Sequence, residues 1–225
     1  VLGSTRGLTV EAREGEEYGS MLGQVTQTND QGQELVDASG NLIPTETKQV
    51  VGNFQPDWTA GIRNTFEYQG LELSTLFDAS IGGDIFCQTC AIGRRTGQLI
   101  ETLEGRDDFE LAHDAVKPDG SPNDIGLPLP VYRRDRYRMF HYYTYDASYV
   151  KLRELTLGFD LPQGFVNAIP FSNARMSVVG RDLLILTKNV PHIDPELTTS
   201  SGNAQGMEVF RTPTQRSLGI RITVR

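Results

Sequence analysis

Cys87 and Cys90 are the first residues whose type and spacing could support chemistry, as a C-x-x-C pair in the segment FCQTC. Zinc sites that use such a pair add a second pair or histidines at ligand spacing, and the sequence offers neither. We therefore expect either two thiols or one local disulfide in a loop. The sequence predicts no metal site and no cofactor.

The three histidines, His113, His141 and His192, are scattered along the chain, and none has a partner at metal-ligand spacing. The segments HDAV and PHIDPE place a histidine near an aspartate, as a general base and its orienting group would be. Neither segment is accompanied by a serine or cysteine nucleophile in a recognisable context. We therefore expect solvated loop histidines, no catalytic residue and no enzyme.

The segment NDQGQELVDASGN carries the Asp, Asn and Gly residues of a calcium loop. It departs from the D-x-[DN]-x-[DN]-G pattern and lacks the later glutamate that completes the ligand set. Turns are the simpler prediction for this segment.

Aromatic and basic residues gather in VYRRDRYRMFHYYTYDASYV, which holds six of the eight tyrosines between Tyr132 and Tyr149. Such a mixture could bind single-stranded nucleic acid by stacking and charge. It could also form a membrane girdle, with tyrosine rings at the lipid headgroups, or a sugar-binding loop. The sequence does not identify which residues bind a ligand.

The net charge of −8 is unevenly distributed along the 225 residues. Acids dominate residues 11–57 and 101–124, whereas the part from Val150 onward carries more Lys and Arg than Asp and Glu. An acidic total argues against a nucleic-acid partner. The sequence holds no apolar run of about 18 residues that would predict a transmembrane helix.

The clearest predicted element is a hairpin in PDWTAGIRNTFEYQGLELSTLFDAS. Apolar residues alternate with polar ones on both arms, as in strands with one apolar face. Gln69 and Gly70 lie between the arms and suit a two-residue turn, because glycine accepts a positive φ. The residues that share the apolar parity are Trp58, Ala60, Ile62, Phe66, Tyr68, Leu71, Leu73, Phe77 and Ala79.

Three further strands are predicted in SYVKLRELTLGFDLP, ARMSVVGRDLLILT and QRSLGIRITVR. The first is expected to end at Pro162. The second starts with Arg175, Ser177, Val179 and Arg181 on one side and Met176, Val178 and Gly180 on the other, and it loses this alternation between Leu183 and Leu186. Together with the hairpin they form an antiparallel meander in an all-β fold. The apolar parity in the first and last strands consists of Leu155, Leu157, Phe159, Leu218, Ile220, Ile222 and Val224.

Two connections, Gly82 to Asp146 and Thr187 to Thr214, are far longer than the usual ~4–6 residues. Short turns at one end and long loops at the other are typical of an outer-membrane barrel, whose strands have an apolar lipid face and a polar lumen face. A soluble secreted β-sandwich, such as a carbohydrate-binding module, has the same pattern if its binding loops lie at one end. The pattern alone leaves both folds open.

Several segments in series resemble the C-terminal end of the SusC/RagA-type TonB-dependent outer-membrane transporters. They are, in chain order, GEEYGSMLGQ, VDASGN, GNFQPDWTAGIRNTFEYQGLELSTLFDASIGGDIF, ASYVKLRELTLGFDLP, VVGRDLLILTK, HIDPE and RTPTQRSLGIRITV. The resemblance spans almost the whole chain, so we expect residues 1–225 to be the C-terminal part of such a barrel.

The resemblance implies a multi-pass β-barrel in the outer membrane of a Gram-negative cell, importing oligosaccharides or peptides. It also implies three partners: outer-membrane lipid, a SusD-like surface lipoprotein, and the TonB complex acting through a plug. A barrel of about 22 strands at ~10 residues per strand needs about 220 residues for strands alone. We therefore expect only the last five to seven strands here, with the plug and most of the barrel absent.

The final strand stops at Arg225, whereas members of this family normally finish on an aromatic residue. If the alternation continues, the next position falls on the lipid face with Val224. We therefore hypothesise that one residue follows Arg225, and that Arg221 and Arg225 face the lumen or the periplasmic rim.

Overall fold

The computed structural model describes residues 1–107, 109–166, 172–199, 202 and 205–224. The chain divides into two compact units. Unit 1 comprises residues 1–55, 83–146 and 190–212, and unit 2 comprises residues 56–82, 147–189 and 213–225. Arg225, whose side chain was expected in the lumen or at the rim, lies outside the described residues.

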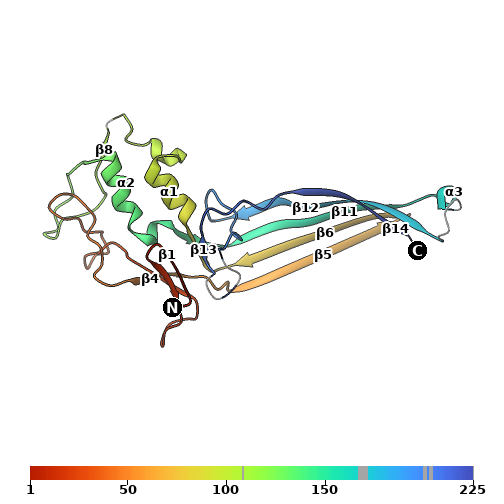
Figure 1. The fold of residues 1–225 in the computed structure, drawn as a ribbon, viewed down its shortest axis with the longest axis horizontal. Coiled ribbons are helices and arrows are strands. Elements are labelled where there is room, and N and C mark those ends of the chain that lie inside the picture. The colour runs from red at the N-terminus through yellow and green to blue at the C-terminus, as the bar shows by residue number, and fades with distance from the viewer. Residues whose placement is uncertain (108, 167–171, 200–201, 203–204, 225) are drawn as a thin grey trace. The chain divides into compact units, whose positions relative to one another are not determined.

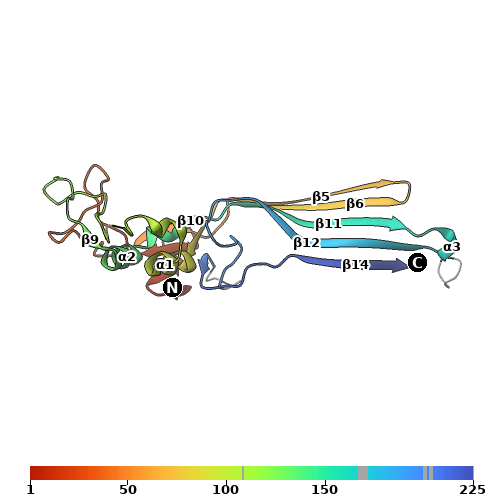
Figure 2. The ribbon, with the colours of Figure 1, turned by 90° about the horizontal axis from the view of Figure 1, so that it is seen from above.

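Unit 2 is built on one antiparallel sheet in which neighbours in sequence are neighbours in space, so the expected meander is confirmed (Figures 1 and 2). The helix α3 (Gln163–Val166) follows the third strand along the chain. In spatial order the strands are β14 (Ser217–Val224), β12 (Ala174–Lys188), β11 (Tyr149–Asp160), β6 (Leu71–Ile81) and β5 (Trp58–Tyr68).

The hairpin of β5 and β6 has the predicted register. Tyr68 pairs with Leu71, and Phe66 pairs with Leu73, so the apolar parities of the two arms meet across the strands. The turn residues Gln69 and Gly70 both have positive φ, at 48° and 80°. This is the backbone of a type I′ turn, whose twist matches that of the flanking strands.

A bulge in β11 and β12 explains the imperfect alternation predicted for Leu183 to Leu186. The register shifts between the pairs Leu152↔Leu184 and Glu154↔Arg181. Two residues of β12 therefore oppose one residue of β11, and Asp182 takes a positive φ of 51°. This bulge changes the side-chain parity of β11. A second shift, between the pairs Val150↔Thr187 and Lys151↔Ile185, changes the side-chain parity of β12.

Both long connections leave the sheet at the same end. Tyr149, the first residue of β11, pairs with Ser80 near the end of β6 and with Lys188 at the end of β12. The connection from β6 to β11 and the connection from β12 to β14 therefore begin side by side. The two-residue turn between β5 and β6 lies at the opposite end.

Unit 1 consists of short strands and helices, which the long-loop prediction did not anticipate. No described helix is long and apolar enough to cross a membrane. The elements of unit 1 are β1 (Gly3–Thr5), β2 (Leu8–Glu11), β3 (Ser20–Gly23), β4 (Gln49–Asn53), β7 (Asp84–Cys87), α1 (Gln88–Thr96), η1 (Ile100–Leu103), β8 (Glu110–Leu111), β9 (Leu127–Pro128), α2 (Leu129–Tyr137), η2 (Phe140–Tyr143), β10 (Thr144–Asp146) and β13 (Met207–Glu208).

The core of unit 1 joins segments that are far apart in sequence. β1 to β4 form one sheet in chain order, and β7 pairs with both β10 and β13 in another. Apolar side chains from these strands and the helices are almost completely buried, so the unit has a hydrophobic core of its own. Its buried members include Leu8, Val10, Met21, Leu22, Val36, Ile85, Phe86, Met139, Tyr143 and Met207.

Candidate functional site

The five-stranded sheet of unit 2 has one face made of large apolar side chains that are uncovered within the unit. On β14, Leu218 is 80% exposed and Ile220 is 73% exposed. Soluble proteins rarely leave an apolar surface of this extent open to water. The exposed apolar residues of this face include Trp58, Ile62, Phe66, Tyr68, Leu71, Leu73, Leu157, Phe159, Val178, Leu218, Ile220, Ile222 and Val224.

The register confirms that these side chains share one face. Ile220 pairs with Val178, and Val178 in turn pairs with Leu157. Residues directly opposite each other in a ladder project to the same side of the sheet. Leu155, Leu157, Phe159, Leu218, Ile220, Ile222 and Val224, the predicted apolar set, therefore lie together with the hairpin's apolar residues.

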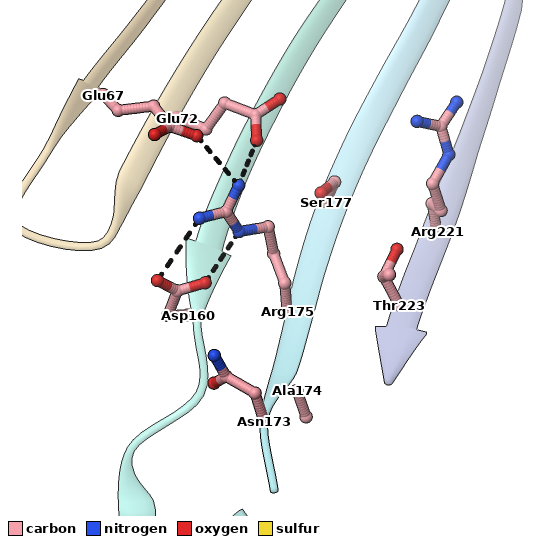
Figure 3. A pocket seen from close by; sticks show the side chains of 9 residues that line it. All are labelled: Glu67, Glu72, Asp160, Asn173, Ala174, Arg175, Ser177, Arg221 and Thr223. Carbon is pink, nitrogen blue, oxygen red and sulfur yellow. Dashed lines mark hydrogen bonds and ion pairs between the residues drawn. The ribbon is translucent and has the colours of Figure 1, made fainter. Parts of the chain in front are cut away.

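The opposite face of the same sheet is polar. Arg175, the second residue of β12, pairs with Asp160 at the end of β11, close to the turn at Gly70 (Figure 3). The guanidinium donates to both carboxylate oxygens of Asp160, from Nε at 2.7 Å and from Nη2 at 3.3 Å. Its Nη1 donates to Glu67 at 3.2 Å and also to Glu72. Arg175 on β12 thus contacts carboxylates from β11, β6 and β5.

Arg221 and Thr223 line the same hollow of about 420 Å³ from β14 (Figure 3). The register places Arg221 on the polar face, opposite Ser177. That Arg221 faces the lumen or the rim stays a prediction. Among the described residues, the Arg221 side chain makes no ion pair. The hollow therefore combines one neutralised arginine with one arginine that is open to solvent or to a bound group.

Further ion pairs continue along the polar face. Glu154 accepts from Arg63 at 3.2 Å and from Arg181 at 3.1 Å. Near the bulge, Arg153 donates to Asp78 at 2.7 Å and to Asp182 at 3.2 Å. Such paired charges are compatible with a wet surface and not with hydrocarbon. The sequence indicated the polar parity of β12 but not the acidic partners, which come from strands up to 108 residues away.

We predict that Arg175→Gln lowers the stability of the sheet by about 1–2 kcal/mol, between the values for exposed and buried ion pairs. The change leaves Asp160, Glu67 and Glu72 close together without their shared cation. The temperature at which the folded form is lost on a semi-native gel measures the effect. Arg221→Gln is the matched control, and an equal loss in both variants would contradict the role given to Arg175.

The histidines do not form a common site. His113 is only 2% exposed, stacks on Tyr132, and its Nε2 lies 3.0 Å from Asp135 Oδ2, so the prediction that it is solvated was wrong. His141 and His192 are partly exposed and lie 3.1 and 2.8 Å from Glu34 and Glu101. Among the described residues, no group of three His, Cys, Asp or Glu side chains could hold a metal ion.

Cys87 and Cys90 form a disulfide, which was one of the two predicted states. The pair lies at the junction of β7 and α1, not in a loop. Cys87 is the N-cap of α1, and its Sγ accepts from the Cys90 backbone N at 3.0 Å. Both residues are fully buried, so the disulfide is part of the core of unit 1.

The tyrosine-rich segment is largely used in packing within unit 1. Tyr143 is 2% exposed, and Tyr142 packs against the cluster around Val36 and Met139. The Arg136 guanidinium lies 3.8 Å from the centre of the Tyr142 ring. The interpretation of this segment as a lipid girdle was therefore wrong for Tyr142 and Tyr143.

Tyr143 supports a prediction about alkaline pH. Burial raises its pKa to about 12, from an ordinary value of 10. Because the folded-state pKa is the higher one, the stability contributed by the neutral phenol is complete below pH 10 and is lost as the pH rises towards 12. We expect the free energy of unfolding of unit 1 to decrease over this range, and its alkaline unfolding is followed by tyrosinate absorbance and circular dichroism together. Tyr143→Phe should shift this unfolding to higher pH, and an unchanged midpoint would contradict the assignment.

The calcium-like segment forms turns, as predicted. Asn29 Oδ1 accepts from the backbone N atoms of Gln31 and Gln33, at 3.0 and 2.9 Å. Asp37 Oδ1 makes the equivalent bonds two and four residues further on. In such turns the side-chain oxygen accepts hydrogen bonds from nearby backbone N–H groups, so it is not arranged as a cation ligand.

A sheet with an open apolar face and an ion-paired polar face has the arrangement of a membrane β-barrel wall. No family model matches the chain. TonB-dependent receptor P3 of Formosa agariphila is 32% identical over 180 residues, which cover 79% of this chain and 17% of that protein. TonB-dependent receptor P39 of the same organism is 25% identical over 192 residues, which cover 82% of this chain and 17% of that protein.

Solved structures show the same fold. The structure of the RagAB peptide transporter matches with a TM-score of 0.53 and 19% identity, over 92% of this chain and 23% of that chain. The RagAB peptide importer in the closed-closed state matches with a TM-score of 0.52 and 18% identity, over 97% of this chain and 22% of that chain. The chain belongs to the TonB-dependent receptors, of the SusC/RagA type that its sequence resembles. It spans about 17% of the length of the curated relatives.

Proposed function

We propose that residues 1–225 form the C-terminal part of an outer-membrane barrel that imports nutrients with energy from the TonB complex. The observation that carries this proposal is the contrast between the two faces of the sheet in unit 2. The apolar face, with Leu157 and Ile220, meets lipid, and the polar face, with Arg175 and Arg221, lines the lumen. The relatives are receptors and not enzymes, which supports a transport role.

The orientation in the membrane follows from the connections. In outer-membrane barrels the short turns are periplasmic and the long loops are extracellular. The turn at Gln69 and Gly70 is therefore assigned to the periplasm, and residues 82–148 and 189–216 are assigned to the cell surface. There they would meet the substrate and a SusD-like lipoprotein. The substrate class is an oligosaccharide or a peptide, and the likeness to a peptide importer supports the second.

The alternative of a soluble secreted β-sandwich with a carbohydrate-binding role has less support. Such a fold buries the apolar faces of its sheets against each other. In unit 2, no described segment covers the apolar face that contains Phe66 and Leu157. Fractionation distinguishes the two, because the sandwich would remain in the aqueous fraction and the barrel would require detergent.

Protease cleavage in intact cells tests the orientation. One variant carries an inserted protease site after Gly120, at an exposed turn where a side chain would meet no neighbour within 4 Å. The matched variant carries the same site between Gln69 and Gly70. We expect cleavage of the first variant in intact cells, and cleavage of the second only after the outer membrane is permeabilised. The reverse pattern would overturn the orientation.

A further inference from the structure

Unit 1 contains a second hollow, of about 450 Å³, whose rim is basic. Arg6, Lys48 and Arg138 line it, and Glu46 is the one acid among its lining residues. The three cations come from segments far apart in the chain: the turn between β1 and β2, the approach to β4, and the end of α2. The fold therefore concentrates positive charge at one place in a chain whose net charge is −8.

None of these three cations has a side-chain partner among the described residues, whereas several other basic residues of unit 1 do. Arg94 contacts Glu101, and Lys117 contacts Asp124 at 2.6 Å. Arg6, Lys48 and Arg138 are all exposed. An approaching anion would therefore meet three available donors without first breaking an ion pair.

The floor of the hollow is buried and includes both apolar and polar groups. Phe140 is 9% exposed, and a side chain at Gly7 would lie 3.3 Å from its ring, so the β1–β2 turn rests directly on it. The buried Gln88 donates from Nε2 to the Tyr137 hydroxyl at 3.2 Å. This bond fixes the Tyr137 oxygen as an acceptor and leaves its own proton free to donate. The site thus combines an apolar floor, a hydroxyl donor and a cationic rim.

The turn that carries Arg6 is itself constrained. Arg6 has a φ of 45° and Gly7 a φ of 105°. A residue other than glycine, asparagine or aspartate is uncommon in this left-handed region. The arginine therefore lies at a position where the backbone disfavours it, and such outliers are found most often at functional sites.

We propose that this hollow in unit 1 binds the carboxylate of an acidic ligand, such as the uronate of an oligosaccharide or the acidic side chain of a short peptide. The cations neutralise the carboxylate, the Tyr137 hydroxyl donates to it, and the ring of Phe140 supports the apolar part beside it. The proposal rests on the geometry of unit 1 alone and does not require that the receptor imports the ligand.

Calorimetric titration of the full receptor in detergent at low salt tests the proposal with matched probes. Digalacturonate is compared with its neutral dimethyl ester, and acetyl-Ala-Glu-amide is compared with acetyl-Ala-Gln-amide. We expect at least one acid to bind about tenfold more tightly than its neutral partner, with affinity falling as salt is added. Comparison of the two pairs shows whether the site binds the carboxylate of a uronate or that of an acidic amino-acid side chain. No binding of either acid, or equal binding within both pairs, would overturn the proposal.

Three variants locate the binding in this hollow. Arg6→Asn keeps a residue that accepts a positive φ. Lys48→Gln and Arg138→Gln remove exposed charges and leave all core side chains in place. Each should weaken binding several-fold while the circular dichroism spectrum stays unchanged. Arg134→Gln, an exposed position on α2 outside the hollow, is the control. Equal weakening by Arg134→Gln would show that only overall charge matters and would also overturn the proposal. Because the titration needs neither a membrane nor TonB, failure of transport leaves its result unaffected.

Discussion

Ile220→Arg is expected to prevent stable assembly of the receptor in the outer membrane. Ile220 lies on the open apolar face, within the row that also contains Val178 and Leu157. A cation on the lipid side near the middle of the bilayer costs about 2–4 kcal/mol, and this cost falls to about 0–1 kcal/mol near the interfaces. The amount of heat-modifiable, folded receptor in outer-membrane fractions measures the effect.

The same strand provides a matched control on the other face. Thr223→Arg places the same cation beside the carboxylates that surround Arg175, and it should assemble normally. Ile222→Arg, closer to the end of β14, should lose less folded receptor than Ile220→Arg. If Thr223→Arg were as damaging as Ile220→Arg, the assignment of the two faces would fail.

Asp135→Ala is expected to destabilise unit 1 by about 2–6 kcal/mol. The buried Asp135 carboxylate accepts from the Leu42 backbone N at 2.6 Å and faces His113 Nε2 at 3.0 Å. Removing it leaves two buried donors unpaired, and each such group costs about 1–3 kcal/mol. Hydrogen exchange of the α2 amides measures the change as a lower free energy of local opening.

Two controls separate this effect from the loss of a surface charge. Asp135→Asn keeps an acceptor for Leu42 and should lose only about 1 kcal/mol, the usual value of one hydrogen bond. Arg134→Gln, next to Asp135 but exposed, should change nothing measurable. If the α2 amides of Asp135→Ala exchanged at the same rate as in the unsubstituted protein, the Asp135 carboxylate would not stabilise the contact between Leu42 and α2. These two segments lie 93 residues apart in sequence.

Local rules were enough to predict the sheet of unit 2. The period of two identified the faces of β5, β6, β11 and β14, and the Gln69–Gly70 turn fixed the hairpin register. Each of these features depends on residues that are adjacent or nearly adjacent in sequence. The bulge near Glu154 was missed because it inserts residues without any glycine or proline to mark it.

Unit 1 could not be predicted in the same way, because its contacts join distant segments. The buried pair of His113 with Asp135, and the bond from Leu42 to Asp135, depend on tertiary placement and have no spacing signal. The polar cluster around Arg175 is an intermediate case. The alternation put Arg175 on the polar face, but only the strand order shows that three carboxylates lie within its reach.

We propose that one face of the unit 2 sheet meets lipid and the other lines the lumen. The most direct test is a scan of single cysteines along β14 in intact outer membranes. The native Cys87 and Cys90 are joined in a buried disulfide and should not react. We predict that a small hydrophilic thiol reagent labels positions 217, 219, 221 and 223, while positions 218, 220 and 222 stay unlabelled. At the unlabelled positions, a fluorophore attached in detergent before reconstitution should be quenched by brominated lipid. Labelling that does not alternate along β14 would contradict the account. Labelling at positions 218, 220 and 222 but not at 217, 219, 221 and 223 would also contradict it.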